Sequence, residues 1–496
     1  MWPALLLLLL GAALVRDAHA QADDQADYCL AKDQFPYLYF GSKTAYERVY
    51  DHKESPQNVP WCRPSTVWMM ASAGTSYPDR ATLVRLYETL PPLQDNILQN
   101  AVQDDGGQAG QRASRTRGRG SPWPRRRGRL CAEDLAALAR WHLNVTEDRA
   151  HWLTGQGQAD LSFLARRLKR RLPELLNTTY SESRFRFRYA SGQRTHESAE
   201  AFASGLFSNE VELPRPVEND PLLEFDELCP AWRKDRERAL KEVEIFEIGA
   251  EMEQTIARVS YRLGFHYNLS MENVDLMWEM CRYDKAWKYV SLSPWCSAFT
   301  EDDLKVMEYR ADLQYYYSYS YGNQLNVKLG CPPVKDMMDH FTRAEMSGGA
   351  AFESIPPPTG VFYFTHDSAL HMMLAALGVA KDPVPLMASN MEQQAKRAFR
   401  TSFIGSFAAN LAAVFYTCDQ GERHRVMFYL RERIVEMEGC QVGLCSWNHL
   451  RTKLAKAANG CDLNFCHTSG SAPFSASSVL AAAAAAALLA ARRLAA

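Results

Sequence analysis

The stretch STVWMMASAGTSYP at residues 65–78 decides the fold. Its first half, Ser65 to Ala71, is a continuous apolar run, and its second half is small and polar with one glycine and one proline. Apolar runs without alternation are typical of strands that are buried on both faces, as in a parallel sheet. We therefore expect a buried strand over residues 65–71 that ends in a polar corner at Ser72, Ala73 and Gly74.

Two other stretches combine a strand-like run, a polar corner and a helical pattern. These three parts fall at residues 361–364, 365–367 and 368–377 in one stretch, and at 185–189, 192–194 and 197–207 in the other. In open α/β sheets, ligands bind at the carboxyl edge of the strands. The predicted fold is therefore α/β, a mostly parallel sheet flanked by helices, with a ligand site where the three corners meet.

A long helical pattern interrupts the sheet segments. It runs from Glu224 to Phe299, with Trp278, Trp287 and Trp295 interleaved, and we interpret it as an all-helical cap. About 450 residues are enough for one large two-part fold. The expected division is a first core part at 29–215, a helical cap at 216–330 and a second core part at 331–466.

Both ends carry processing signals. Residues 1–20 combine a short apolar run with Ala18-His19-Ala20, which predicts a signal peptide. At the other end, residues 469–496 hold a small-residue triplet, a polar spacer and an apolar run, which matches a glycolipid-anchor signal; a soluble tail and a membrane span are the alternatives. We expect a secreted, cell-surface or secretory-lumen protein that meets the membrane only through such an anchor.

Cysteine usage agrees with an oxidising compartment. The twelve cysteines are an even number, which favours disulfides, although the spacing does not give their pairing. A zinc site at the pairs Cys440/Cys445 and Cys461/Cys466 is a weaker alternative, because the spacing is wide and no histidine pair accompanies them. Three glycosylation acceptors are predicted at Asn144, Asn177 and Asn268.

Charge excludes one class of partner and marks one unusual segment. The net charge of −2 and the pI of about 6.6 argue against a nucleic-acid partner. Residues 104–129 are rich in Gly, Arg, Ser and Pro, which predicts a disordered basic insertion. A proteolytic or polyanion-binding loop is the functional alternative for this segment.

Several motifs resemble those of the histidine acid phosphatases. Trp61-Cys62-Arg63-Pro64 with Gly74-Thr75-x-Tyr77-Pro78 is similar to their first motif, the segment from Arg194 to Gly205 to their middle motif, and His366-Asp367 to their third. The segments 281–287, 293–296 and 330–336 point to the multiple inositol polyphosphate phosphatase branch. The resemblance implies the fold of that family, hydrolysis of phosphomonoesters and inositol phosphates as ligands.

The first motif departs from the family pattern Arg-His-Gly-x-Arg-x-Pro. In the family the His attacks phosphorus and the two Arg bind phosphoryl oxygens, whereas Ala73 has no nucleophile and Ser72 and Ser76 have no charge. Ser76 as a substitute nucleophile is the weaker hypothesis, because the sequence shows no base beside it. Ala73 therefore marks a degenerate nucleophile position, and Ser72 and Ser76 mark degenerate phosphate-binding positions.

Half of a site remains. By resemblance, Arg194 binds phosphate, His366 contacts the phosphoryl group and Asp367 protonates the leaving alcohol; the inositol branch more often has a Glu where Ser368 stands. The structural alternatives are a surface arginine, a helix-cap histidine and a carboxylate at a helix start. We expect no cofactor and no metal site, because His366 and His371 lie on different sides of a helix and no H-E-x-x-H pattern occurs.

Two functional hypotheses follow. The first is a pseudophosphatase that binds a phosphorylated ligand and is inactive or weak as an enzyme. The second is an active extracellular phosphomonoesterase that hydrolyses inositol polyphosphates. Five tyrosines between Tyr315 and Tyr321 fit packing near the cap better than sugar stacking.

Overall fold

The computed structural model describes residues 29–33, 39–50, 58–102, 128–208, 211–347 and 356–467. The predicted signal peptide at 1–20, the predicted anchor signal at 469–496 and nearly all of the basic insertion at 104–129 lie outside the described residues. Within the described ranges, no helix is both long enough and apolar enough to cross a membrane.

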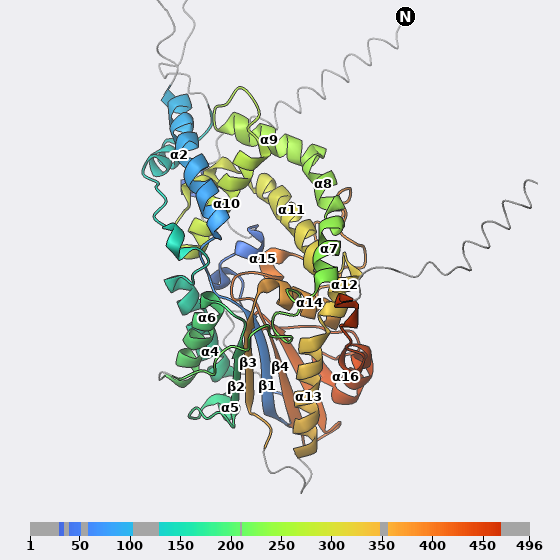
Figure 1. The fold of residues 1–496 in the computed structure, drawn as a ribbon. Helices are drawn as coiled ribbons and strands as arrows, with labels where there is room; N and C mark the ends of the chain where they lie inside the picture. Colours follow the sequence, from blue (N-terminus) through green and yellow to red (C-terminus); the bar gives the residue numbers. More distant parts are fainter. Residues whose placement is uncertain are drawn as a thin grey trace, which may run out of the picture.

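One mixed sheet forms the base of the molecule (Figure 1). The strand order is β2-β3-β1-β4-β5-β6, and β7 pairs with β5. The strands are β1 (Cys62–Ser72), β2 (Phe185–Tyr189), β3 (Gly360–Thr365), β4 (Asn410–Cys418), β5 (His424–Leu430), β6 (Arg433–Ile434) and β7 (Leu444–Ser446). The three strands expected from the sequence are confirmed.

The α/β class is confirmed, but the sheet is mixed rather than mostly parallel. The pairs β2–β3 and β3–β1 are parallel, whereas β1–β4, β4–β5, β5–β6 and β5–β7 are antiparallel. Only residues 419–423 join β4 to β5, which is too short for the crossover that a parallel pair needs. The parallel half therefore ends at β1, and β1 is the strand that carries the degenerate motif.

Helices cover both faces of the sheet, as continuous apolar strands require. Val67, Trp68, Met69, Met70 and Ala71 of β1 are all fully buried. The odd-numbered members of this run belong to the core under α4 (Gly155–Arg171) and α6 (Gln193–Phe207). Trp68 and Met70 belong to the core under α13 (Cys331–Ser347) and α14 (Asp367–Leu377).

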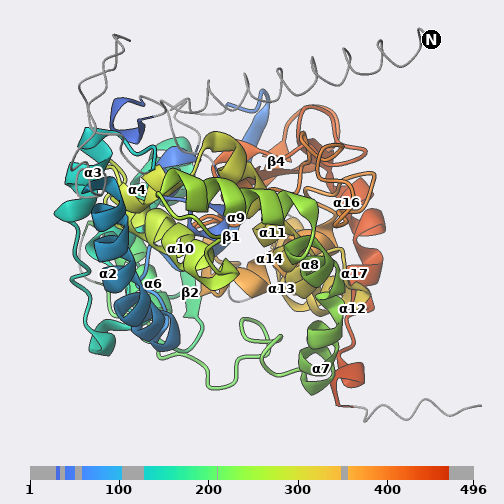
Figure 2. The same ribbon diagram turned by 90° about the horizontal axis from the view of Figure 1, so that it is seen from above.

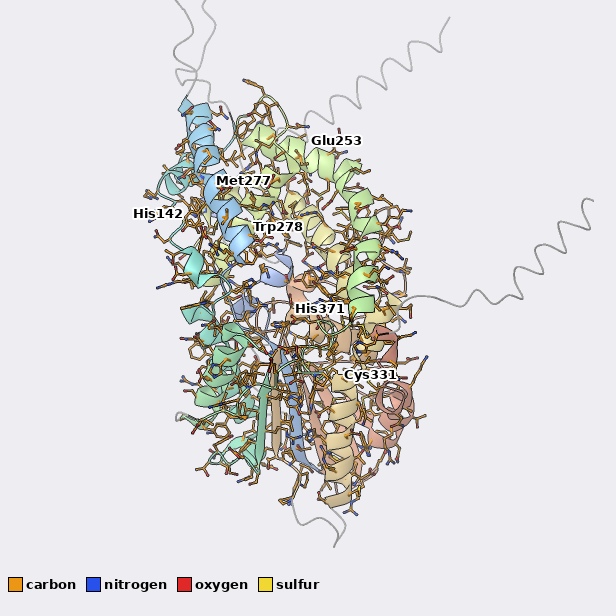
Figure 3. The ribbon with its side chains drawn as sticks, viewed as in Figure 1. His142, Glu253, Met277, Trp278, Cys331 and His371 are labelled. Atoms are coloured by element: carbon orange, nitrogen blue, oxygen red, sulfur yellow. A yellow bond between two sulfur atoms is a disulfide. The ribbon has the colours of Figure 1, made fainter. Side chains whose placement is uncertain are left out.

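A layer of helices lies over the carboxyl edge of the parallel strands (Figures 1 and 2). It comprises α7 (Pro230–Ala239), α8 (Lys241–Glu247), α9 (Ala250–Arg262), α10 (Met271–Trp287), α11 (Glu301–Tyr319) and α12 (Gln324–Leu329), with α2 (Arg80–Val102) beside α10. Met277 and Trp278 lie in this layer and His371 lies below it, toward the sheet (Figure 3). The helical content of 224–299 is confirmed, and the division into domains stays a prediction.

Shorter helices complete the fold. They are α3 (Ala132–Ala139), α5 (Pro173–Leu176), α15 (Thr401–Ile404), α16 (Trp447–Lys453) and α17 (Ala455–Asn459).

Disulfides are present, as the cysteine count predicted. The pairs are Cys29–Cys131, Cys62–Cys418, Cys229–Cys466, Cys281–Cys296, Cys331–Cys461 and Cys440–Cys445. The zinc alternative is wrong, because all four of its cysteines are bonded to other sulfurs. The Cys62–Cys418 bond joins β1 to its antiparallel neighbour β4.

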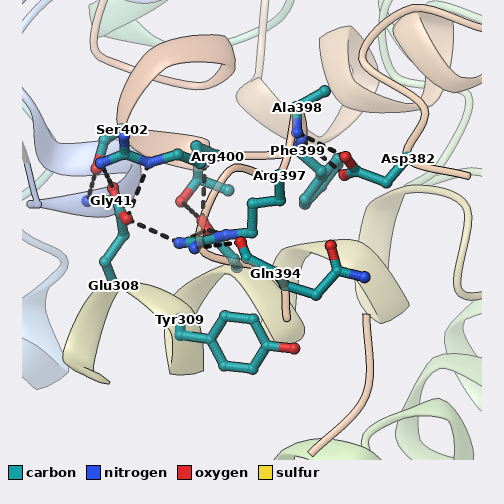
Figure 4. Close-up of polar contacts among 12 residues, drawn as sticks. Gly41, Glu308, Tyr309, Asp382, Gln394, Arg397, Ala398, Phe399, Arg400 and Ser402 are labelled. Atoms are coloured by element: carbon teal, nitrogen blue, oxygen red, sulfur yellow. Dashed lines mark hydrogen bonds and ion pairs between the residues drawn. The ribbon is translucent and has the colours of Figure 1, made fainter. Parts of the chain in front are cut away.

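A buried cluster of charges fastens α11 to the segment that contains α15 (Figure 4). Glu308 accepts from Arg397 (2.7 Å) and Arg400 (3.0 Å). Asp312 accepts from Arg397 Nε (2.6 Å) and from the backbone N–H of Thr401 (2.8 Å). The side chains of Glu308, Asp312 and Arg397 are at most 6% exposed, so each charge depends on its partners for compensation.

Replacing Arg397 should therefore destabilise the fold strongly. In Arg397→Ala, Asp312 loses its guanidinium partner while it stays buried, and breaking such a pair costs about 3–5 kcal/mol. Urea unfolding with the disulfides intact measures the loss. The matched control is Arg80→Ala, whose pair with Glu147 is exposed and should contribute at most about 1 kcal/mol. Equal losses in the two variants would contradict the role given to the cluster.

Candidate functional site: a small pocket at the sheet's carboxyl edge

The end of β1 is fixed by backbone hydrogen bonds. The N–H of Ser72 donates to Ala409 O (2.8 Å), and the N–H of Ala73 donates to Thr365 O of β3 (3.2 Å). The carbonyl of Ala73 accepts from the N–H of Ala408 (3.0 Å). The position of residue 73 is therefore set without any help from its side chain.

The rest of the first corner packs closely against α4 and α6. A side chain at Gly74 would meet Gly157 O at 2.6 Å, so this position has room only for glycine. Gly74 N–H donates to Ser198 Oγ (3.1 Å), and Thr75 Oγ1 donates to the buried Asp160 (2.7 Å). Burial raises the pKa of Asp160 to about 6, against the hydrogen bonds that lower it. The frame of the first motif is thus intact around its substituted side chains.

The middle corner supplies Arg194. Gly192 has φ 121°, a left-handed conformation that glycine adopts easily, and α6 begins immediately after it. Arg194 stands in the first turn of that helix, and its Nη2 lies 3.3 Å from His366 Nδ1. Since a guanidinium only donates, Nδ1 of His366 is the acceptor and its proton is on Nε2.

The third corner supplies His366 and Asp367. His366 is the N-cap residue of α14 and Asp367 its first residue. The Nε2 of His366 lies 3.6 Å from Glu227 Oε1. Asp367 Oδ2 accepts a hydrogen bond from the Tyr315 hydroxyl (2.6 Å), which lies 2.8 Å from Ser42 Oγ.

Together these corners enclose a small cavity of about 40 Å³. Its lining includes all six sequence-predicted site residues, namely Ser72, Ala73, Ser76, Arg194, His366 and Asp367. The other lining residues are Ser42, Lys43, Gly74, Gly405, Ser406 and Phe407. The expectation that these three corners meet at one place is confirmed, while the role of each residue stays a prediction.

The sequence analysis missed Lys43 and Tyr315. Lys43 comes from the N-terminal segment and lies over the rings of Phe407 (5.3 Å) and Tyr283 (5.8 Å). Tyr315 belongs to the tyrosine run, whose other members Tyr317 and Tyr321 do bond to backbone carbonyls in the packing. No local signal separates Tyr315 from its neighbours, because its role depends on a contact with Asp367 far along the chain.

The charges around Asp367 favour its ionised form. Burial opposes ionisation, but the Lys43 ammonium, the Tyr315 hydroxyl, His371 and Arg194 together lower the pKa of Asp367 to about 2. Burial lowers the pKa of Lys43, and Asp367 opposes that shift. The free pocket therefore holds a carboxylate opposite an arginine and a partly buried lysine.

A model of the histidine phosphatase superfamily (branch 2) matches residues 123–432. The chain is 33% identical to multiple inositol polyphosphate phosphatase 1 of Drosophila melanogaster, with 94% of each chain covered. It is 29% identical to the protein of the same name from Homo sapiens, over 85% of this chain and 87% of the other. The chain belongs to the multiple inositol polyphosphate phosphatase branch of this superfamily.

Solved structures show the same fold. The phytase of D. castellii has a TM-score of 0.65 at 15% identity and covers 88% of both chains. The Bifidobacterium longum multiple inositol polyphosphate phosphatase, in complex with inositol hexasulfate, has a TM-score of 0.60 at 14% identity, over 85% of this chain and 98% of the other. The histidine phosphatase fold expected from the motifs is confirmed.

Within this family frame, no imidazole or carboxylate is hydrogen-bonded to the hydroxyls of Ser72 or Ser76 among the described residues. Ser72 Oγ is buried without any partner. The Ser76 carbonyl accepts from Trp287 Nε1 (3.2 Å), which holds its backbone rather than its hydroxyl. The hypothesis of a serine nucleophile therefore gains no base from the described part of the chain.

Four residues from the sequence analysis lie outside the pocket. Asn144, Asn177 and Asn268 are all exposed, as glycosylation requires, and their modification stays a prediction. His371 is buried, and its Nδ1 lies 2.8 Å from Asp367 O. Its ring is therefore not placed to bind the same ligand as His366.

Removing the charge at position 43 should raise the pKa of Asp367. In Lys43→Met, burial is no longer offset by the ammonium, so the pKa should move from about 2 toward or above the ordinary value near 3.9. Because the pKa is depressed in the wild type, its contribution to stability is present above about pH 4 and is lost as the pH falls through about 2. NMR titration of the Asp367 carboxyl carbon measures the shift. Lys335→Met, an exposed lysine on α13, is the control and should leave it unchanged.

Proposed function

We propose that this chain binds a phosphorylated ligand in the pocket without hydrolysing it. One observation carries the proposal: residue 73 follows the end of β1, its backbone is fixed by hydrogen bonds to Thr365 and Ala408, and its side chain is a methyl group. A covalent phosphoenzyme needs a nucleophilic atom at that point, and a methyl group has none.

The loss of charge around Ala73 supports the same proposal. Phosphoryl transfer depends on fixed positive charge at the oxygens, and removing a single such contact commonly costs on the order of a hundredfold or more in rate. Ser72 and Ser76 replace two such charges by neutral hydroxyls.

Ligand binding is supported by what remains. Arg194 and Lys43 line the pocket as cations, and His366 offers a further polar contact. The curated relatives are named for inositol polyphosphates, and a relative of known structure was solved in complex with phosphate. Inositol phosphates are therefore the ligands that we propose first, with Lys43 as the second cation of the pocket beside Arg194.

We also propose that the protein acts outside the cytosol, secreted or at the cell surface. Six disulfides support an oxidising compartment. The glycolipid anchor remains part of this proposal, and release of the chain from cells by a phosphatidylinositol-specific phospholipase tests it.

Binding without turnover is the central test. The purified chain should bind inositol hexakisphosphate by calorimetry and release no phosphate from it above a no-protein blank. Arg194→Ala should lose most of the binding, while Arg80→Ala, an exposed arginine of α2, should keep it. Phosphate release that disappears in Asp367→Ala would establish the active phosphomonoesterase instead. Equal affinity in wild type and Arg194→Ala would show that the ligand does not bind in this pocket.

Restoring the family residues should restore chemistry. Ser72→Arg, Ala73→His and Ser76→Arg together supply the nucleophile and both phosphate contacts on an intact frame. Ala73→His alone should do little, because catalytic groups that act as a unit are not additive. Phosphate release at acid pH should appear in the triple variant and vanish on adding Asp367→Ala. A folded triple variant without activity would mean that the residues lining the pocket no longer have the arrangement that catalysis needs.

A further inference from the structure

The charges that line the pocket are few. Among the described residues of its lining, Lys43 and Arg194 are the cations and Asp367 is the carboxylate. His366 turns Nδ1 toward Arg194 (3.3 Å) and Nε2 toward Glu227 (3.6 Å). Lys43, Arg194 and Asp367 together therefore contribute a net charge of one positive unit.

Neutral donors dominate the rest of the lining. Ser42, Ser72, Ser76 and Ser406 also line the cavity. The Ser406 hydroxyl donates to Phe407 O (3.1 Å), and Ser42 Oγ lies 2.8 Å from the Tyr315 hydroxyl. Ser72 is 3% exposed, and its Oγ has no hydrogen-bond partner in the described part of the chain. A buried hydroxyl without a partner is costly, and an oxygen that only accepts would satisfy it.

The size of the cavity fits one oxyanion group. Its volume of about 40 Å³ holds roughly three waters at about 10–15 Å³ each. The three terminal oxygens of one sulfate or phosphate ester would replace those waters. The remainder of such a ligand lies toward the mouth of the pocket.

Charge decides between the two kinds of ester. A phosphomonoester carries about −1.5 to −2 at neutral pH, with a second pKa near 6, whereas a sulfate monoester carries a single negative charge throughout this range. Excess charge taken out of water without a partner is strongly unfavourable. A cavity lined by two cations, one carboxylate and neutral serines compensates a monoanion and leaves a dianion undercompensated.

We propose that the pocket selects a singly charged tetrahedral oxyanion ester, namely a sulfate monoester of a polyol or sugar, or a phosphomonoester that retains one proton. The inference rests on the proposed function, because both need the pocket to bind an oxyanion ester. It adds the charge state of the group that is bound, and it makes sulfated polyols a ligand class for this chain.

Several protein groups also titrate or carry charge near the pocket. Those that face it from the surrounding elements are His151, Glu227, Asp226, His371, Tyr315, Asp79, Glu279 and Arg282. Their protonation alters the affinity for any anion. A sulfate ester keeps its charge across this range, so its pH dependence reports the protein groups alone.

Four calorimetric titrations test the proposal: glucose 6-phosphate and glucose 6-sulfate, each at pH 5.0 and pH 7.5, with the full chain. At pH 7.5 the sulfate should bind more tightly than the phosphate. Lowering the pH from 7.5 to 5.0 should raise the affinity for the phosphate about thirtyfold more than it raises the affinity for the sulfate. The reason is that the monoanionic fraction of the phosphate rises by that factor for a second pKa near 6.

A charge-restoring variant sharpens the test. Ser72→Arg with Ser76→Arg adds two positive charges to the lining, so phosphate should bind more tightly than sulfate at pH 7.5. The matched control, Ser65→Arg with Ser183→Arg, places the same charges on exposed serines before the parallel strands reach the pocket and should keep the wild-type order. If the buried substitutions prevent folding, the wild-type titrations still show whether the pocket prefers the sulfate or the phosphate ester.

The outcomes separate the two proposals. Binding of neither ester at either pH overturns this inference, and if inositol hexakisphosphate is not bound either, the proposed function falls with it. Phosphate bound at least as tightly as sulfate at pH 7.5, with no extra gain at pH 5.0, overturns the inference alone. A sulfate preference that survives Arg194→Ala overturns it as well, because the anion would then sit elsewhere.

Discussion

The hydrogen bonds around the backbone of Ala73 hold three distant parts of the chain together. Its N–H reaches the end of β3 and its carbonyl reaches Ala408, next to β4. These contacts use no side-chain atom, so the corner keeps its place whatever residue stands there. The substitution of the family histidine therefore removes chemistry and leaves the geometry of the pocket walls, with Arg194 and His366 still 3.3 Å apart.

The second half of the pocket depends on the buried charge cluster of α11. Glu308 and Asp312 hold the segment 397–401, and the next residue, Ser402, accepts a hydrogen bond from Gly41 N–H (2.8 Å). Gly41 precedes Ser42 and Lys43, while Tyr315 stands one turn after Asp312 and binds Asp367. Helix α11 thus orients Asp367 through Tyr315. Through the segment that ends at Ser402, it also positions Lys43 opposite that carboxylate.

Local patterns sufficed for the parts of the site that lie on continuous elements. The runs at 65–71, 185–189 and 361–364 end in glycine or polar residues, and this pattern predicted three strands and the edge where they meet. The direction of β4 could not be predicted, because an apolar run such as NLAAVFYTC reads alike in either direction. Lys43 and Tyr315 could not be predicted either, because each acts through a partner hundreds or tens of residues away.

Proton linkage ties the ionisation of Asp367 to the charge of whatever enters the pocket. An arriving anion raises the pKa of a nearby carboxyl, and a dianion raises it more than a monoanion does. With two family arginines present, that repulsion would be offset at the oxygens themselves, but Ser72 and Ser76 offer only hydroxyl donors. A dianion must then either remain repelled by Asp367 or bind together with a proton. The substitutions at 72 and 76 therefore change two properties at once: they weaken the stabilisation of phosphoryl transfer, and they bias the pocket toward ligands, or ligand protonation states, of lower charge.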